Sequence, residues 1–367
     1  MRIERTALAD LAWGAAFLGS GGGGDPYYSL LLAEAAFERS GGFELIGLDE
    51  IADDALVAPC GWIGAPTVSV EKLPNGNEAV SGLRRLEAIM GRRIDAVLPI
   101  EIGGGNGLAP FLAAAELGVP VLDCDGMGRA FPESQMAIFN IRGLSACPSI
   151  VTDASGALAV IETTDNDAHE RIARGLSVSM GGIAHMVEYP LSGAQAKATA
   201  IPGSVSTACA IGAAVRRARA DGRSSFAALE RAVEATGLYP YCRTLFDGKI
   251  VDLERETRGG FSVGRVIIEG LRSSSRMMIE FQNENLAAWG DGVLRAIVPD
   301  LITIMDSETA DAITTERLKY GQRVRVVAAA APAQLRDATA LSFVGPAAFG
   351  YDTPFVPVER LNAEIAA

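Results

Sequence analysis

Acidic, basic and amide side chains gather directly after one apolar run of the chain. Residues 119–122 suit a buried strand, and glycines beyond them let the backbone bend sharply. Carboxylates there can transfer protons and an arginine can stabilise an anion, so this stretch can carry acid–base chemistry. The alternative is a structural turn, in which the aspartates cap backbone groups and the arginine pairs with one of them. The predicted catalytic residues are Asp123, Asp125, Arg129 and Glu133, with Gln135 as a substrate contact.

A β-α-β unit surrounds this stretch, and its parts are a strand at 94–100, a helix at 109–117 and a strand at 119–122. Such a crossover is right-handed and its strands are parallel, so the loops 101–106 and 123–129 should emerge at one edge of one sheet. Ligands of open α/β sheets bind at such edges, which predicts an active site there. From the first loop we expect a catalytic carboxylate, Glu101, and three substrate contacts, Gly104, Gly105 and Asn106.

Four consecutive glycines stand at the junction of two predicted helices. After them, Asp25 is a suitable N-cap and Pro26 suits the first helical position. The glycines formally satisfy the G-x-G-x-x-G pattern, but a dinucleotide site needs a preceding strand, so we expect no such cofactor. Bare backbone N–H groups at a helix start make a polar cradle for an anion or a carbonyl oxygen, whereas the alternative is a flexible corner. The predicted substrate contacts are Gly21, Gly22, Gly23, Gly24 and Asp25.

Two further polar segments could face a ligand. Glu71 stands beside Lys72 in a loop, where it is either functional or part of a solvated ion pair. The run Gln282–Leu286 places amide and acid side chains directly after an apolar strand. It is either a turn that binds its own backbone or a loop that faces a ligand. Glu71, Asn283 and Asn285 are accordingly predicted as substrate contacts.

Length and composition predict a globular α/β protein of two domains. The chain has 367 residues, more than single cores usually span, and 49% hydrophobic residues. Residues 1–243 should form a layered α/β domain with a parallel β-α-β core. From residue 244 the pattern changes to short alternating strands, which predicts a mostly antiparallel, barrel-like domain over 244–330. The tail 331–367 is expected to pack back on the first domain. Further helices are expected at 78–90, 167–179, 203–220 and 225–236, and strands at 43–48, 56–63, 150–152 and 158–161.

The charge pattern excludes several classes of partner. A net charge of -13 and a pI of about 4.8, without clustered Lys and Arg, argue against nucleic acid. No window approaches the roughly 18 uninterrupted apolar residues of a membrane span. Asp10 interrupts the first apolar run, which therefore does not match a signal peptide, and the five cysteines contain no C-x-x-C pair. We expect a reduced, cytoplasmic protein that forms a homo-oligomer.

Metal binding finds little support in the sequence. The chain has two histidines, of which His169 opens an exposed-looking helix and His185 lies near a predicted strand. Neither has a histidine or cysteine at ligand spacing, so a tetrahedral zinc site is not expected. Asp123, Asp125 and Glu133 could form an oxygen-only magnesium or calcium site, but nothing in the pattern requires one. We therefore predict neither a metal nor a cofactor.

A combination of short segments is more specific than any single glycine motif. The segments are Gly21–Pro26, Gly64–Thr67, Glu71–Lys72, Gly103–Asn106, Asp123–Glu133, Gln282–Leu286, Pro299–Ile302 and Phe349–Tyr351. Together they resemble the S-methyl-thiohydantoin desulfurase family, which is associated with hydantoinase and oxoprolinase enzymes. The resemblance covers nearly the whole chain, with both the N-terminal and the C-terminal family domains. It implies an α/β domain joined to a β-barrel domain, and a small cyclic amide as the substrate.

The reaction implied by the resemblance is hydrolysis of an S-methyl-thiohydantoin ring to a hydantoin, with release of methanethiol. Such a reaction needs a base for water, an acid for the leaving thiol, and N–H donors for the developing charge. The predicted base is Asp123 or Asp125 and the acid is Glu133 or Glu101, while Arg129 and the glycine-loop amides stabilise the anion. Two alternatives stay open: a ring-opening cyclic amidohydrolase, and a non-catalytic or regulatory protein that binds a hydantoin-like ligand.

Overall fold

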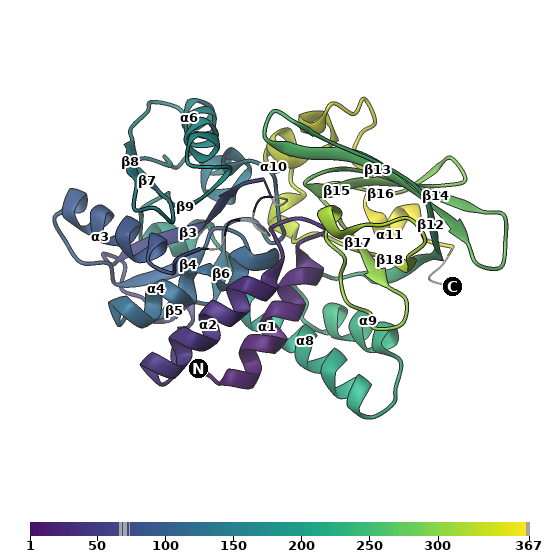
Figure 1. Ribbon diagram of the computed structural model, residues 1–367, viewed down its shortest axis with the longest axis horizontal. Coiled ribbons are helices and arrows are strands. Elements are labelled where there is room, and N and C mark those ends of the chain that lie inside the picture. Colours follow the sequence, from purple (N-terminus) through teal and green to yellow (C-terminus); the bar gives the residue numbers. More distant parts are fainter. Residues whose placement is uncertain (66–67, 69–71, 73, 365–367) are drawn as a thin grey trace.

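The chain folds around two large sheets that lie side by side, one in an α/β part and one in a half-barrel (Figure 1). The structure is a computed structural model, and it describes residues 1–65, 68, 72 and 74–364. The predicted contact Glu71 lies outside the described residues. Among the helices of the described residues, none is long and apolar enough to cross a membrane.

The first sheet is mixed and has nine strands. Its order is β1-β2-β5-β4-β3-β9-β7-β8, with β10 paired to β3. The pair β4–β5 is parallel, as the β-α-β pattern predicts. The pairs β2–β5 and β4–β3 are parallel too, and the β9, β7 and β8 side is antiparallel. The strands are β1 (Arg2–Ile3), β2 (Phe43–Ile46), β3 (Leu56–Gly64), β4 (Ala96–Pro99), β5 (Val121–Leu122), β7 (Ser149–Thr152), β8 (Leu158–Ile161), β9 (Ile183–Val187) and β10 (Leu191–Ser192).

Helices cover this sheet, and their ends follow the sequence signals. Asp25 accepts a hydrogen bond from the backbone N–H of Tyr27 at 2.9 Å and caps α2, which ends at a left-handed Gly41. Helices α1 and α8 can approach closely because Gly14 has no side chain, and a Cβ at this position would lie 2.0 Å from the backbone oxygen of Ala208. The helices are α1 (Arg5–Leu18), α2 (Pro26–Ser40), α3 (Glu78–Met90), α4 (Ala109–Leu117), α5 (Ile138–Ile141), α6 (Asn166–Ser179), α7 (Gly193–Thr199), α8 (Ser204–Ala220) and α9 (Ser225–Ala235).

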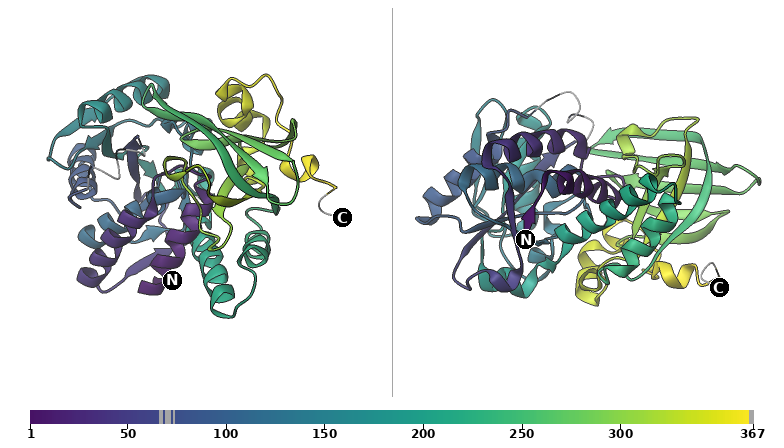
Figure 2. Two further views of the ribbon diagram at one scale, coloured as in Figure 1. Left: turned by 45° about the vertical axis from the view of Figure 1, so that its right-hand side comes forward. Right: turned by 90° about the horizontal axis from the view of Figure 1, so that it is seen from below.

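The second sheet is a curled antiparallel half-barrel (Figure 2). Its strand order is β16-β15-β14-β13-β12-β18-β17, and side chains of β14 alternate between exposed or half-buried and buried positions, as expected for one face on a core. The strands are β12 (Cys242–Arg258), β13 (Phe261–Gly270), β14 (Arg276–Gln282), β15 (Glu284–Gly290), β16 (Val293–Ile297), β17 (Leu301–Asp306) and β18 (Arg323–Ala329). The sheet falls in the region predicted to be β-rich, whereas the division into two domains stays a prediction.

The C-terminal tail divides between the two parts. Helix α10 (Ala338–Val344) places Ala340 and Val344 in the core of the α/β part. Helix α11 (Val358–Leu361) instead places Val358 in the core of the half-barrel, so the expectation that the whole tail rejoins the first domain is wrong. Asp300 holds this end of the chain, because its buried carboxylate accepts from the backbone N–H of Val358 at 2.8 Å.

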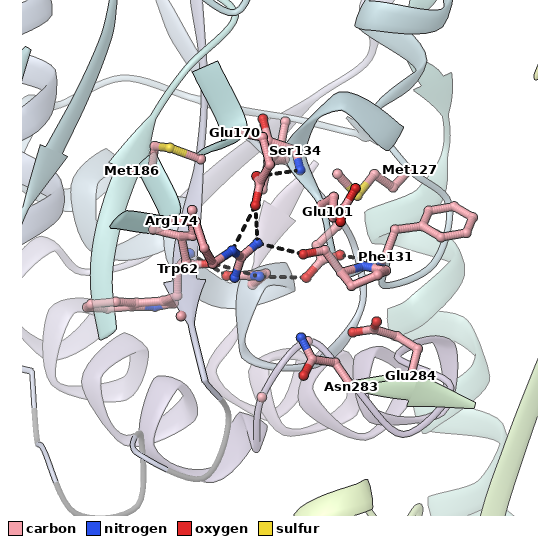
Figure 3. A pocket seen from close by; sticks show the side chains of 18 of the residues that line it. Trp62, Glu101, Met127, Phe131, Ser134, Glu170, Arg174, Met186, Asn283 and Glu284 are labelled. Atoms are coloured by element: carbon pink, nitrogen blue, oxygen red, sulfur yellow. Dashed lines mark hydrogen bonds and ion pairs between the residues drawn. The ribbon is translucent and has the colours of Figure 1, made fainter. Parts of the chain in front are cut away.

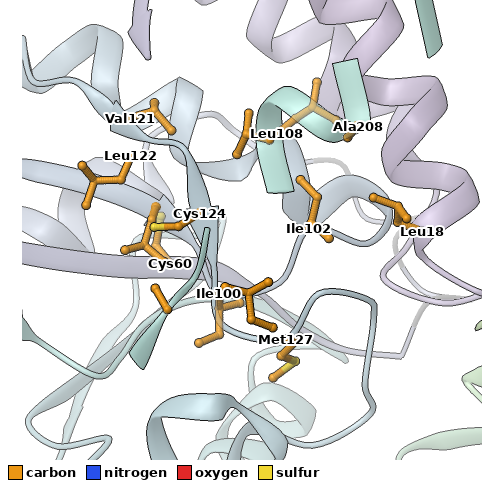
Figure 4. Close-up of a cluster of buried hydrophobic side chains, with 14 of the residues drawn as sticks. Leu18, Cys60, Ile100, Ile102, Leu108, Val121, Leu122, Cys124, Met127 and Ala208 are labelled. Atoms are coloured by element: carbon orange, nitrogen blue, oxygen red, sulfur yellow. The ribbon is translucent and has the colours of Figure 1, made fainter. Parts of the chain in front are cut away.

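An apolar cluster lies beneath the loops that follow β4 and the short strand β6 (Cys124–Asp125) (Figure 4). Ile100, Ile102 and Met127 from these loops are buried in it. Cys124 is also part of this core, and burial raises the pKa of its thiol well above the ordinary value. The cluster therefore holds both loops against the core of the α/β part.

Candidate active site

A cavity of about 90 Å³ lies where loops of the α/β part meet the half-barrel (Figure 3). Its walls come from the glycine loop after α1, the ends of β3 and β4, the segment 127–134, helix α6, strand β9 and the β14–β15 turn. We call it the acidic cavity because five glutamates line it. They are Glu101, Glu133, Glu170, Glu188 and Glu284.

Glu101 stands directly after β4, at the carboxyl end of a central parallel strand. Its side chain accepts hydrogen bonds from Asn106 Nδ2 at 2.6 Å and from the backbone N–H of Phe131 at 2.9 Å. Burial raises the pKa of Glu101 to about 8, although these two hydrogen bonds oppose the shift. Glu101 therefore keeps its proton at neutral pH and can act as an acid.

Asn106 connects this acid to an aromatic wall. Its Oδ1 accepts from the backbone N–H of Trp62 at 2.6 Å, while its Nδ2 reaches Glu101. The Trp62 ring lines the acidic cavity and meets the ring of the buried His185 edge-on, with centroids 5.1 Å apart. The loop after β4 thus positions an acid and a flat apolar surface together.

A second protonated carboxyl follows strand β9. Burial raises the pKa of Glu188 to about 8, and the hydrogen bond from Ser134 Oγ opposes the shift. Ser134 is held in turn by Tyr189, whose hydroxyl donates to the backbone oxygen of Ser134 at 3.1 Å. Ionisation of Glu101 disfavours ionisation of Glu188, because the charge of Glu101 is one of the factors that raise the pKa of Glu188.

Helix α6 contributes an ion pair to the same wall. Arg174 Nε donates to Glu170 at 2.7 Å, and Glu170 also accepts from the backbone N–H of Ser134 at 3.0 Å. The guanidinium lies 4.7 Å from the centre of the Phe261 ring at the β12–β13 turn. Arg174 is therefore tied both to its own helix and to the half-barrel.

The glycine loop packs against the β14–β15 turn. A Cβ on Gly22 would lie 2.0 Å from Glu284 Oε1, so only glycine leaves room for this buried carboxyl. Burial raises the pKa of Glu284 well above its ordinary value, and the charge of Glu101 raises it further. Gly23 also meets the loop after β4, because the backbone N–H of Gly105 donates to its oxygen at 2.9 Å.

The structure places the two predicted aspartate bases away from the acidic cavity. Asp125 Oδ2 is buried and accepts from the backbone N–H groups of Ile102, Met127 and Gly128 at 2.9, 3.0 and 2.7 Å. Asp123 Oδ1 accepts from the backbone N–H at residue 206 at 2.8 Å. Asp125 therefore organises its own turn, whereas Asp123 binds the first turn of helix α8. The catalytic roles predicted for the two aspartates stay predictions. Burial raises the pKa of Asp125 to about 6.

Arg129 is not among the residues that line the acidic cavity, and its role as anion stabiliser stays a prediction. Its guanidinium is fully buried, and Nη1 donates to the backbone oxygens of Pro299 and Asp300 at 3.0 and 2.8 Å. Nη2 donates to the backbone oxygen of Asn285 at 3.3 Å. Arg129 therefore joins the α/β part to the half-barrel.

Other predicted contacts divide between wall and support. Gly23, Gly24, Glu133, Asn106 and Asn283 line the acidic cavity, so the predicted loops do converge there. Asp25 and Gly105 line a neighbouring compartment. The other predicted contacts support these walls. Gly22 and Gly104 pack closely against Glu284 and Gly23, and Gln135 donates to Glu133. The backbone oxygen of Gly21 accepts from the N–H of Thr315, and the backbone N–H of Asn285 donates to the oxygen of Ser20.

The run Gln282–Leu286 forms a turn whose side chains bind other segments rather than its own backbone, since Asn283 Oδ1 accepts from the backbone N–H of Ser262 and Asn285 Nδ2 donates to the backbone oxygen of Ile302. The run is the β14–β15 turn, with Asn283 in the left-handed region at φ 59°. The same turn places Asn283 and Glu284 in the wall of the acidic cavity. The sequence pattern predicted the two asparagines as contacts but not the glutamate between them, Glu284.

The remaining missed residues had no distinct signal. Trp62 lies inside an apolar strand, and Ser134 and Phe131 lie in a stretch that was singled out for its carboxylates. Glu170 and Glu188 are single acids on a helix and after a strand, and only packing turns them inward. The change from a buried apolar strand to Glu188-Tyr-Pro could have marked one of them.

Both histidines are buried and uncharged, which corrects the expectation that His169 is exposed. Its Nε2 is 2.7 Å from Ser149 Oγ, and burial lowers its pKa to about 4. Burial lowers the pKa of His185 to about 3. Among the residues that the structure describes, no group of three or more His, Cys, Asp or Glu side chains is arranged to hold a metal ion.

The fold and the site define an α/β protein whose mixed sheet meets an antiparallel half-barrel around a carboxyl-rich cavity. Family models for the S-Me-THD-like N-terminal and C-terminal domains match residues 6–163 and 164–358. The chain therefore belongs to the S-Me-THD-like family, that of S-methyl-thiohydantoin desulfurases, as its motifs indicated. The boundary between the two family domains falls between β8 and α6.

One solved structure supports the same fold. It is the X-ray crystal structure of a protein from Chromobacterium violaceum, with 24% sequence identity and a TM-score of 0.80. The match covers 98% of this chain and 100% of that chain. At this identity the likeness concerns the fold alone. A search of curated proteins found no match.

Proposed function

We propose that the protein is a hydrolase that converts an S-methyl-thiohydantoin into a hydantoin and methanethiol in the acidic cavity. The observation that carries this proposal is the pair of carboxyls, Glu101 and Glu188, whose pKa values burial raises to about 8. Such groups hold protons at neutral pH, yet they are close enough to neutrality to release them. Family membership supports the choice of substrate.

The charge of the wall favours a neutral or weakly basic ring. Five carboxyls line the acidic cavity, and the guanidinium of Arg174 is already paired with Glu170. An anionic substrate would find no free cation among these residues. A thiohydantoin ring instead offers nitrogens that can accept a proton or donate to a carboxylate, and the Trp62 indole offers a flat surface for it.

The reaction uses one water and needs a proton moved in each direction. Water adds to the ring carbon that bears sulfur, so a C–O bond forms, and a carboxylate takes the proton of the water. The C–S bond then breaks, and a protonated carboxyl delivers a proton to the leaving sulfur. The products are methanethiol and a hydantoin whose new carbonyl holds the oxygen of water, after the hydroxyl proton of the adduct moves to the ring nitrogen. The two carboxyls together keep the same number of protons but have exchanged their states, so one proton must pass from the base to the acid, directly or through solvent, before the next turnover.

Glu101 is the proposed acid, because two fixed donors hold its carboxyl in one place. Glu188 is the proposed base in its ionised form, and a pKa of about 8 leaves it a usable ionised fraction near neutral pH. The mutual repulsion of the two groups favours the state in which one is charged and the other neutral. That state is the one in which the reaction can begin.

The test is incubation of the purified protein with S-methyl-thiohydantoins, with thiol and hydantoin measured separately by a chromogenic assay and by chromatography. Protein without substrate is the control, because the five cysteines can themselves react with thiol reagents. Equal amounts of thiol and hydantoin would support the proposal. A ring-opened acid would indicate a cyclic amidohydrolase, and tight binding without product would indicate a binding protein.

A further inference from the structure

A second compartment adjoins the acidic cavity on the side of helix α2. It has a volume of about 60 Å³ and shares four wall residues with the acidic cavity, which are Gly23, Gly24, Trp62 and Ile183. We call it the side compartment. A ligand whose reacting atoms lie beside Glu101 would have the side compartment directly across Trp62.

Trp62 is a rigid boundary between the two spaces. Asn106 binds both polar groups of its backbone, with Oδ1 accepting from the N–H at 2.6 Å and Nδ2 donating to the oxygen at 3.4 Å. The ring packs edge-on against the buried His185. Because the same Asn106 also binds Glu101, the position of the acid and the position of the boundary are fixed together.

The charged residues around the side compartment are occupied by the protein itself. Lys72 Nζ donates to the backbone oxygen of Ile183 at 3.2 Å and lies 3.9 Å from Asp153. Glu78 accepts from the backbone N–H groups of the turn at 75–76, at 2.8 and 2.9 Å. A charged ligand group would have to displace these contacts, so an uncharged group fits the compartment better.

Several of the other wall residues that the structure describes are aromatic or aliphatic. Tyr28 is half-buried on α2 and faces the compartment, together with Ala184 of β9 and Pro74. Ser29 adds one small hydroxyl. Trp62 and Tyr28 thus present two aromatic rings to a space of limited size, which is the usual chemistry for an apolar or aromatic substituent.

We propose that the side compartment receives the substituent carried by the substrate's ring, and that this substituent is uncharged and apolar or aromatic. The inference rests on the proposed function, since the ring itself is placed in the acidic cavity. It narrows the substrate from any S-methyl-thiohydantoin to one that carries a group such as benzyl or isobutyl on the saturated ring carbon. Tyr28 then determines specificity without touching the reacting atoms.

The test compares Tyr28→Ala with Tyr27→Ala, its neighbour on the same helix. Tyr27 is 54% exposed and lies outside both walls, although its ring contacts that of Tyr28. Each variant is assayed with the unsubstituted and the 5-benzyl S-methyl-thiohydantoin. We expect Tyr28→Ala to lower kcat/KM for the benzyl compound about tenfold or more, mainly through KM, and to leave the unsubstituted compound nearly unchanged. Tyr27→Ala should change neither.

Binding of the unreactive products separates this inference from the proposed function. Calorimetry of the wild-type protein should show tighter binding of 5-benzylhydantoin than of hydantoin or of the 5-carboxyethyl compound. Thiol release with equal kcat/KM for the unsubstituted and the 5-benzyl substrate would overturn the inference and leave the proposed function standing. Preferential binding of the benzyl compound without any thiol release would overturn the proposed function and keep the side compartment as a binding site. Equal loss in Tyr28→Ala for both substrates would also contradict the inference.

Discussion

Replacing Glu101 with glutamine removes the proposed acid while keeping its size. In the wild-type protein, the Glu101 side chain accepts hydrogen bonds from Asn106 and from the backbone N–H of Phe131. A glutamine at this position has only one acceptor oxygen for these two donors. One donor is left unsatisfied, which should cost about 1–3 kcal/mol of folding free energy. Thiol release should fall about 10²- to 10⁴-fold, the usual contribution of a general acid.

The pH dependence of stability tests the protonation state directly. Burial raises the pKa of Glu101 in the folded protein to about 8 from an ordinary 4.5. Below pH 4.5 the carboxyl is protonated in both states, so nothing is lost there. As pH rises towards 8 the unfolded chain ionises while the folded protein keeps its proton, and the free energy of unfolding falls. The penalty grows from about 1 kcal/mol at pH 5 to about 4 kcal/mol at pH 8.

Glutamine does not ionise and carries no such penalty. The difference in the free energy of unfolding between Glu101→Gln and the wild-type protein should therefore change sign with pH. We expect Glu101→Gln to be less stable at pH 5 by up to about 2 kcal/mol and more stable at pH 8 by a similar amount, measured by urea unfolding. Glu116→Gln is the matched control, because Glu116 is exposed and its ion pair with Arg39 should contribute little. A constant difference across this range, together with normal thiol release, would refute the assignment of Glu101 as a protonated acid.

Three further substitutions test the other assignments. Asp125→Asn should lower the free energy of unfolding by about 1–3 kcal/mol, because three backbone N–H groups lose a charged acceptor, while thiol release per folded molecule stays near normal; a large loss of turnover in fully folded protein would return Asp125 to the catalytic centre. Gly22→Ala should abolish activity or folding, because the added Cβ clashes with Glu284. A Cβ on Gly24 would meet no atom within 4 Å, but Gly24 has φ +77°, so Gly24→Ala should lower the free energy of unfolding by only about 1–3 kcal/mol in thermal melts. Equal effects of the two variants would contradict the close packing of Gly22. Arg129→Met should lower the free energy of unfolding by about 3–5 kcal/mol in urea titrations, because several buried backbone oxygens lose their donor; a near-neutral result would show that Arg129 does not hold the two parts together.

Local signals in the sequence were sufficient for most elements. Asp25 and Pro26 start α2 where the capping rules place it, and the β-α-β pattern gives the parallel pair β4 and β5. This topology predicted that the loops after β4 and β5 converge, and Glu101, Asn106 and Glu133 do line one cavity. These features depend on a few neighbouring residues, so they can be read from the chain.

The assignment of roles depended on burial, which the sequence does not state. Asp123 and Asp125 have the same side chains whether they bind backbone amides or water, and only the fold shows that backbone N–H groups already occupy them. Glu188 and Glu170 reach the cavity because β9 and α6 pack beside it, although no motif distinguishes them. His169 looked exposed because its neighbours are polar, yet its ring points into the core.

The most direct test of the central claim is a single-turnover reaction in water enriched in oxygen-18, with 5-benzyl-S-methyl-thiohydantoin as the substrate and product masses followed over time. We predict one methanethiol per hydantoin formed, one heavy oxygen in the hydantoin at the carbon that carried sulfur, and a strong loss of this product in Glu101→Gln and Glu188→Gln but not in Glu116→Gln. A ring-opened acid that retains its methylthio group, or unchanged substrate with fully folded protein, would contradict the account.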